Sequence, residues 1–177
     1  DALGASVVVH HLPMRFGYGI FKAGTHQWFV PLPMWQMDRA YRAWIETGYA
    51  ACQRETAAVL CIENMPARQA LGRRWNAFYW NTVRAFTRFE SVTMDTTHLG
   101  TWGLDPATVY AIWGTRVKHV HLSNFDGQEH RRPEAGHLDL GTLLTTLAAS
   151  DYRGAVTLEL SPAGLEAGCP DDEMRDH

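Results

Sequence analysis

The stretch VKHVHLSNFDGQEHRRPEAGHLDL, at residues 117–140, gathers histidines and carboxylates directly behind a strand-like alternation of apolar residues. Histidine and carboxylate side chains are common ligands of divalent metals, and both residue types transfer protons in enzymes. Elsewhere in the chain, three acidic residues stand at or near the ends of apolar runs: Glu63, Asp95 and Glu159. The sequence therefore indicates metal or acid–base chemistry, provided that the fold brings these separate strand ends together.

Five short runs have the length and composition of β-strands, and each is bounded by Gly, Pro, Asp or Asn. They cover residues 6–11, 57–63, 91–95, 117–123 and 155–160. Apolar residues between these runs recur every three or four positions, which predicts helices. The predicted helices cover residues 33–54, 69–88, 105–113 and 138–150. Strands that alternate with helices favour a parallel sheet built through right-handed crossovers.

Parallel sheets place their functional side chains at the carboxyl ends of the strands. His10 and His121 also stand near the ends of predicted strands, whereas His11 is expected to be a loop residue. Residues two apart on a strand share a face, so Thr157 and Glu159 point in the same direction. We therefore expect the polar faces of the strands to line the interior of a closed barrel, and the apolar faces to contact the helices.

Six short segments span nearly the whole chain and contain most of these strand ends. They are VVVHH at 7–11, IENMP at 62–66, DTTH at 95–98, HVHLS at 119–123, HRRPEAG at 130–136 followed by LD at 138–139, and TLELSP at 157–162. In this order they resemble the motifs of the xylose isomerase-like TIM barrels. That family includes sugar (phosphate) isomerases and epimerases and the endonuclease IV type of abasic-site nuclease. The resemblance implies an α/β fold of the (β/α)8 TIM-barrel type.

The length of the chain fits only part of such a barrel. A complete (β/α)8 barrel takes about 250 residues, so 177 residues hold about five of its eight β/α units. We identify the five predicted strands with the last five of the barrel. Residues 1–177 are then a single, partial TIM-barrel domain, and the missing units lie upstream or come from another chain. By itself, a sheet with two unpaired edges and an exposed polar interior would be a poor stable state.

The resemblance implies a metal site with ligands from four strands. The implied ligands are Glu63, Asp95, His121 and Glu159, and the two glutamates are also the implied acid–base pair. Three carboxylates and one imidazole suit Mn²⁺ or Mg²⁺, with Zn²⁺ as an alternative. The residues assigned to substrate binding or to a second metal are His98, His130, His10, Trp102 and Arg131. Among these, Arg131 could bind an anionic group such as phosphate.

These assignments predict a divalent-metal-dependent isomerase or epimerase of sugars, sugar phosphates or polyols. A bound ion would chelate two neighbouring substrate oxygens and stabilise an enediolate, while a carboxylate moves the adjacent proton. One alternative is an abasic-site phosphodiesterase of the endonuclease IV type. Its metal cluster needs an aspartate two residues before the loop histidine, where this chain has Gln128. The other alternative is a non-catalytic barrel relative that only binds a ligand or a partner.

Net charge and cysteine content limit the partners and the compartment. The formal net charge is −3 and no long basic run occurs, so a small sugar or sugar phosphate is favoured over nucleic acid. No segment approaches the roughly 18 consecutive apolar residues of a membrane span. Three cysteines without CxxC spacing indicate a reducing compartment, which we take to be the cytoplasm. Because barrels of this kind often pair, a homodimer is one expected state.

Overall fold

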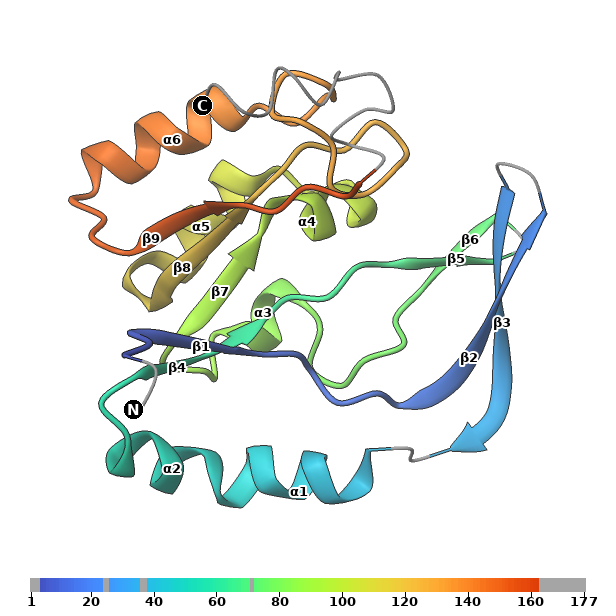
Figure 1. Ribbon diagram of the computed structural model, residues 1–177, viewed down its shortest axis with the longest axis horizontal. Helices are drawn as coiled ribbons and strands as arrows, with labels where there is room; N and C mark the ends of the chain where they lie inside the picture. Colours follow the sequence, from blue (N-terminus) through green and yellow to red (C-terminus); the bar gives the residue numbers. More distant parts are fainter. Residues whose placement is uncertain (1–3, 24–25, 36–37, 71, 163–177) are drawn as a thin grey trace.

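Five parallel strands form the central sheet of the computed structural model, which describes residues 4–23, 26–35, 38–70 and 72–162 (Figure 1). In spatial order they are β1 (Val7–His10), β4 (Val59–Glu63), β7 (Val92–Asp95), β8 (Val117–Leu122) and β9 (Ala155–Leu158). Every neighbouring pair is parallel, and the spatial order follows the chain order. The predicted five-stranded parallel sheet is confirmed, and with its helices it forms a half-barrel.

Helices connect the successive strands of this sheet. They are α1 (Arg39–Thr47), α2 (Tyr49–Glu55), α3 (Val83–Phe86), α4 (Thr96–Trp102), α5 (Pro106–Trp113), the 3-10 turn η1 (Gly114–Arg116) and α6 (Leu140–Ala149). In the described part of the chain, no helix has both the length and the hydropathy to cross a membrane.

Two of the predicted helices, at 105–113 and 138–150, are confirmed, and an aspartate caps each of them. Asp105 begins α5 by accepting a hydrogen bond from the Thr108 backbone N–H at 2.7 Å. Asp139 begins α6 in the same way, through the Thr142 N–H at 2.9 Å. Such side-chain caps satisfy backbone donors that a helix leaves free at its first turn. The predicted helix at 33–54 starts later than expected, because its first residues belong to strand β3 (His26–Trp35) and are followed by α1 and α2.

The predicted helix at 69–88 is wrong. Strands β5 (Arg68–Ala70) and β6 (Arg73–Trp75) form a short antiparallel hairpin there, and α3 covers only the last part of the range. Gly72 lies in the turn with a φ of +70°, a conformation that glycine adopts without a steric penalty. Trp75 is 42% exposed, whereas the adjacent Ala77 and Phe78 are both buried. The apolar spacing therefore does not mark one buried face of a helix.

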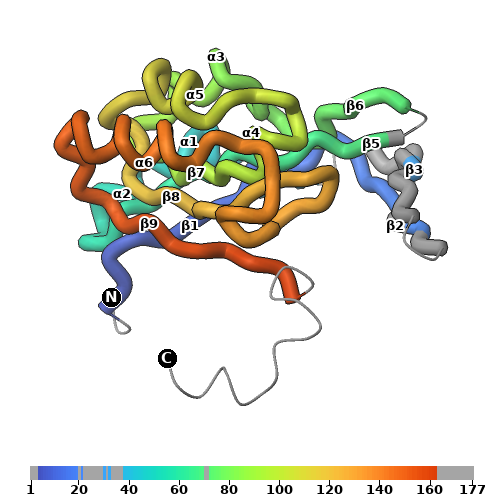
Figure 2. Tube along the Cα trace, turned by 90° about the horizontal axis from the view of Figure 1, so that it is seen from above, coloured from blue at the N-terminus to red at the C-terminus, as the bar shows by residue number. Residues whose placement is uncertain are grey.

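A second antiparallel pair was not predicted from the sequence. Strands β2 (Phe16–Ala23) and β3 form a two-stranded ribbon between β1 and α1. Figures 1 and 2 both place this ribbon beside β5 and β6, at the end of the molecule away from α5 and α6. Phe21 and Val30 of the ribbon are exposed. Phe16 and Tyr18, in the first part of β2, pack against the hydrophobic core, so the exposed part of the ribbon lies beyond them.

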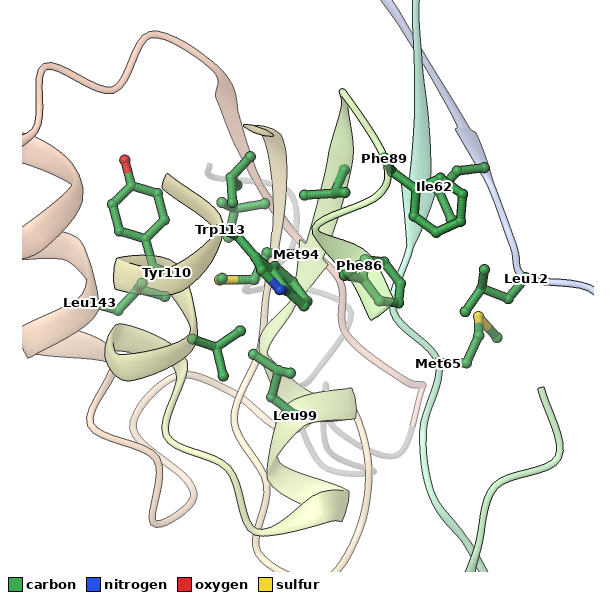
Figure 3. Packing of buried hydrophobic residues seen from close by; sticks show 14 of the residues in the cluster. Leu12, Ile62, Met65, Phe86, Phe89, Met94, Leu99, Tyr110, Trp113 and Leu143 are labelled. Carbon is green, nitrogen blue, oxygen red and sulfur yellow. The ribbon is translucent and has the colours of Figure 1, made fainter. Parts of the chain in front are cut away.

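The hydrophobic core lies between one face of the sheet and the helices (Figure 3). Phe86 and Trp113 stack at its centre with ring centroids 4.8 Å apart. Met94 on β7 and Val120 on β8 are fully buried in the same core. Because side chains alternate along a strand, Asp95 and the other polar strand residues point to the opposite face. The predicted separation into an apolar and a polar face holds for these central strands.

Candidate metal centre

Four polar side chains meet at the carboxyl ends of the parallel strands. Glu63 and Asp95 are the last residues of β4 and β7. His121 on β8 lies in register with Asp95, and Glu159 directly follows β9. One potential ligand atom from each of the four residues lies within 4.8 Å of the others. The structure thus brings together the four residues, distant from one another in the chain, that the family resemblance implied as metal ligands.

His121 Nδ1 stands between the three carboxylates. It lies 2.7 Å from Oε2 of Glu159, 3.0 Å from Oε1 of Glu63 and 3.8 Å from Oδ2 of Asp95. Burial by itself lowers the pKa of His121, but its contacts with Glu159 and Glu63 outweigh burial and raise the pKa to about 10. Without a metal, a proton on His121 therefore supplies the positive charge that these carboxylates need.

The carboxyl group of Asp95 is the most deeply buried of the three. Its Oδ1 accepts a hydrogen bond from the His98 backbone N–H at 2.8 Å. Its Oδ2 is buried and has no hydrogen-bond partner among the residues that the structure describes. Burial raises the pKa of Asp95 well above its usual value, and the negative charge of Glu63 adds to this effect. A cation beside Oδ2 would remove this cost, so the donor set fits a divalent ion.

Glu63 is held from two sides. Its Oε1 contacts His121, and its Oε2 lies 3.1 Å from Nε2 of His11. Burial by itself raises the pKa of Glu63, but the hydrogen bonds from His11 and His121 outweigh burial and lower the pKa to about 2. Glu63 is therefore ionised over the whole physiological pH range.

The structure assigns His11, rather than His10, to this centre. The ring of His10 packs against Trp44 of α1, with ring centroids 5.4 Å apart, while the neighbouring His11 reaches Glu63. Adjacent residues at the end of a strand point to opposite faces, so only one of the two histidines can face the carboxylates. The prediction for His10 is corrected on this ground. The motif VVVHH does not distinguish the two histidines, and the register that pairs His10 with the core residue Ile62 decides between them.

His98 lies beside the four residues, in the first turn of α4. Its Nδ1 is 2.7 Å from the backbone oxygen of Asn64 and 3.7 Å from Oε1 of Glu63. Burial lowers the pKa of His98, which favours a neutral ring with one N–H. Because a carbonyl oxygen only accepts hydrogen bonds, that hydrogen belongs on Nδ1. Nε2 then keeps a lone pair for a metal or for a substrate hydroxyl.

The loop after β8 brings His130 to the same side as His98. Asn124 closes this loop by donating to the carbonyl of Pro133 at 2.6 Å and accepting from the N–H of Leu138 at 2.9 Å. His130 has a φ of +59°, which is uncommon for a residue other than glycine and often occurs at functional sites. Its ring lies 5.4 Å from that of His98. Asp95, His98 and His130 form a second group whose potential ligand atoms lie within 4.8 Å of one another.

Comparison with known proteins identifies the fold. A family model described as "Xylose isomerase-like TIM barrel" matches residues 1–175. The chain belongs to this family. No curated protein matches the chain significantly.

Two solved structures resemble this xylose isomerase-like barrel. A D-tagatose 3-epimerase-like protein has a TM-score of 0.63 and 17% identity, with 89% of this chain and 57% of that chain covered. The 3-keto-D-glucoside 4-epimerase YcjR from E. coli has a TM-score of 0.55 and 20% identity, with 78% of this chain and 51% of that chain covered. The chain thus spans little more than half the length of either structure. At these identities the likeness concerns the fold.

In this barrel, an acidic residue that the sequence reasoning missed lies close to His98. Glu129 Oε2 is 3.8 Å from Nε2 of His98, and Glu129 Oε1 is 3.5 Å from Nη1 of Arg68. The adjacent Gln128 is exposed, and its backbone N–H donates to Asp126 at 3.0 Å. Glu129 thus places a carboxylate one residue after position 128, at which the nuclease pattern requires an aspartate. Its position next to a loop histidine was the available signal.

Trp102 and Arg131 contact residues outside the group of four central residues. Trp102 donates from its indole N–H to the carbonyl of Met65 at 3.1 Å and lines a cavity of about 330 Å³ with Leu99 and Phe86. None of the four central residues lines that cavity. Arg131 Nε lies 3.0 Å from Oδ2 of Asp126 within its own loop. The assignment of these two residues to the substrate therefore stays a prediction.

Proposed function

We propose that this chain forms the metal-binding part of a divalent-metal-dependent isomerase or epimerase that acts on a sugar, a sugar phosphate or a polyol. The observation that carries the proposal is the convergence of three carboxylates on Nδ1 of His121, with Oδ2 of Asp95 buried and without a described hydrogen-bond donor. The epimerase names of the two structural neighbours support the same reaction class.

Four residues would hold the ion in this proposal: Glu63, Asp95, His121 and Glu159. Their oxygen-rich donor set favours Mn²⁺ or Mg²⁺, and Zn²⁺ is the alternative. When bound, the ion would supply positive charge to two neighbouring substrate oxygens, and this charge would stabilise an enediolate. His121 must then present Nδ1 without its proton, since a metal ligand needs the free lone pair.

Glu63 and Glu159 are the proposed acid–base pair. Their carboxylates reach His121 from β4 and from the end of β9, which are different strands of the sheet. His11 orients the second oxygen of Glu63 at 3.1 Å. One glutamate, as the carboxylate, would remove the proton from the carbon next to the carbonyl. The other, protonated from solvent, would give its proton to the enediolate, and the first would then release its proton to solvent. Each positioned carboxylate of this kind typically accelerates a reaction by about 10²–10⁴-fold.

Exchange of carbon-bound hydrogen with solvent tests this proposal directly. The metal-free protein is loaded with Mn²⁺ in D₂O and incubated with D-tagatose or a 3-keto-glucoside, the compounds suggested by the names of the structural neighbours. Deuterium uptake next to the carbonyl is followed by NMR. We expect uptake that EDTA abolishes and that Glu159→Gln slows by about 100-fold or more. Glu134→Gln, at an exposed position in the loop after β8, is the matched control. Failure of the Mn²⁺-loaded protein to exchange any of a panel of ketoses would overturn the proposal.

A metal-dependent abasic-site phosphodiesterase is the second candidate. The group of Asp95, His98 and His130 supports it, because such nucleases use more than one metal, and Glu129 adds a carboxylate near His98. The net charge of −3 disfavours a DNA substrate. Chelator-sensitive cleavage of duplex DNA with one abasic site would favour this candidate over the isomerase. No bound metal near stoichiometry, together with no metal-dependent turnover for Glu63→Gln or Asp95→Asn to reduce, would instead favour a non-catalytic relative that only binds a ligand.

We also propose that further β/α units complete the barrel, from elsewhere in a longer chain or from a partner chain. The sheet ends at β1 and β9, and all four residues of β9 are exposed. A homodimer is one way to cover these edges. The two described cysteines, Cys52 and Cys61, are free thiols, which supports a reducing, cytoplasmic setting, while Cys169 lies outside the described residues.

A further inference from the structure

The side chain of Asn64 links β4 to β7 just beyond the point at which the backbone pairing of these two strands stops. The residue follows Glu63 directly and is buried. The register between β4 and β7 consists of two pairs, Ile62 with Val92 and Glu63 with Thr93. One residue further on, the carboxamide of Asn64 binds both polar groups of the Asp95 peptide. Its Oδ1 accepts from the Asp95 N–H at 2.8 Å, and its Nδ2 donates to the Asp95 carbonyl at 3.0 Å.

The backbone of Asn64 is engaged in the same cluster. Its carbonyl oxygen lies 2.7 Å from Nδ1 of His98, and the His98 N–H in turn donates to Oδ1 of Asp95 at 2.8 Å. All three residues are buried. Each of them is therefore held by the other two, and Asn64 has no direct contact with the carboxylate oxygens that face His121 among the described hydrogen bonds.

We propose that Asn64 is a positioning residue that aims Asp95 and His98 at the metal centre. Its carboxamide holds the Asp95 peptide in place of a strand neighbour, so that Oδ2 of Asp95 faces Nδ1 of His121. Its carbonyl keeps the hydrogen of His98 on Nδ1 and leaves Nε2 as the binding atom. Hydrogen-bond partners that orient ligands in this way strengthen metal sites. The metal-binding part of this inference rests on the proposed function, but the effect on His98 does not.

Asn81 provides a matched comparison for Asn64. It is also buried, and its carboxamide makes the same pair of bonds to a backbone peptide. Its Oδ1 accepts from the Met65 N–H at 3.0 Å, and its Nδ2 donates to the Met65 carbonyl at 2.8 Å. Met65 is a core residue with no ligand atom in either metal-binding group. A purely structural role predicts the same consequences for the loss of either asparagine.

The test compares Asn64→Ala with Asn81→Ala in the same protein. Thermal unfolding in EDTA measures the cost to the fold, and calorimetric titration with Mn²⁺ measures the affinity for the metal. We expect both variants to lose thermal stability, because each leaves a buried peptide unpaired. Only Asn64→Ala is expected to weaken Mn²⁺ binding, by about 10–100-fold. Wild-type affinity in Asn64→Ala, or an equal loss in Asn81→Ala, would overturn the inference.

A second pair of variants and a metal-free measurement cover the remaining outcomes. Asn64→Asp and Asn81→Asp keep the shape and the acceptor oxygen but lose the donor, and they replace the alanine variants if those do not fold. In EDTA, the Nδ1–H resonance of His98 should keep its wild-type position in the Asn81 variants and shift in the Asn64 variants, because the Asn64 carboxamide anchors the backbone whose carbonyl accepts this hydrogen. If the wild type binds no Mn²⁺, the proposed function fails while this resonance still tests Asn64. An unchanged His98 resonance in the Asn64 variants would then contradict the positioning role.

Discussion

Glu63 and Glu159 bring the same chemical group to His121 from very different surroundings. Glu63 ends β4, which has a strand on either side, and its side chain is 2% exposed. Glu159 follows β9, the edge strand, and its side chain is 42% exposed. His11 and His121 both contact Glu63, and Glu63 is paired with Thr93 of β7. We call Glu63 and Asp95 the interior half of the centre, and Glu159 its edge half. The packed fold positions the interior half, whereas the edge half depends on its contact with His121 and on whatever covers β9.

The largest effect is expected from neutralising Asp95 in the interior half. Asp95→Asn should weaken Mn²⁺ binding by more than the roughly 10–100-fold that accompanies the loss of a hydrogen-bond partner of a ligand. In EDTA, the same variant should be as stable as the wild type or more stable, since it removes a buried charge beside Glu63 and asparagine also caps helices well. Calorimetric titration and thermal unfolding in EDTA measure the two quantities.

Asp105→Asn is the control for this prediction. Asp105 caps α5 as Asp95 caps α4, but it has no place in either metal-binding group. Its variant should bind Mn²⁺ like the wild type. Retention of Mn²⁺ binding by Asp95→Asn would show that the interior half of the centre is not the metal site.

A smaller, but still large, difference is expected between interior and edge packing. Met94 on β7 is 0% exposed, so Met94→Ala should lower the free energy of unfolding by about 2–5 kcal/mol. Leu158 on β9 is 57% exposed, so Leu158→Ala should change it by no more than about 0.5 kcal/mol. Urea unfolding monitored by tryptophan fluorescence measures both. A loss for Leu158→Ala as large as that for Met94→Ala would mean that another segment or chain covers β9.

The smallest effect concerns the pH dependence of the metal-free protein. The pKa of His121 is raised to about 10 in the folded state, against about 6.5 when unfolded. Its contribution to stability is therefore fully present below pH 6.5 and is lost as the pH rises through 10. In EDTA, the wild type should lose stability between these pH values. Glu159→Gln should lose less, because one of the two carboxylates that raise the pKa is gone.

Urea unfolding at several pH values, in EDTA, measures this difference. Glu134→Gln should follow the wild type, since Glu134 lies in the loop after β8 with an exposed side chain. Identical pH profiles for Glu159→Gln and the wild type would indicate that the edge glutamate does not contact His121 in solution. In that case the centre would consist of its interior half alone.

The elements that were predicted correctly are those whose signals are local. The five parallel strands follow from short apolar runs, and α5 and α6 follow from apolar residues that recur every three or four positions; the caps Asp105 and Asp139 also bond within one turn. The β5–β6 hairpin was missed because its residues were assigned to the helix at 69–88, and residues 16–32 of the β2–β3 pair were assigned to no element. In the first of these, the turn at Gly72 and the pairing of residues 68–70 with residues 73–75 replace the helix.

The candidate site was predictable to a similar extent. Glu63, Asp95, His121 and Glu159 were selected by family resemblance and strand-end position, and the structure places them around one nitrogen. His10 was chosen over His11 as the strand-end histidine, but the register pairs His10 with Ile62, a core residue, so that His11 is on the side of Glu63. Asn64 and Glu129 were not selected at all. Asn64 has no local pattern that distinguishes a role at the site from ordinary hydration, whereas Glu129 stands next to the loop histidine His130.

The sequence by itself determined which residue types stand at the strand ends and which face of each strand they share, because side-chain alternation is a property of the single strand. Only the tertiary structure decided which atoms meet. The register between neighbouring strands sets His121 beside Asp95, and the stop in pairing after Glu63 leaves the Asp95 peptide to Asn64. Both depend on contacts between residues far apart in the chain, whose free energies no local pattern encodes.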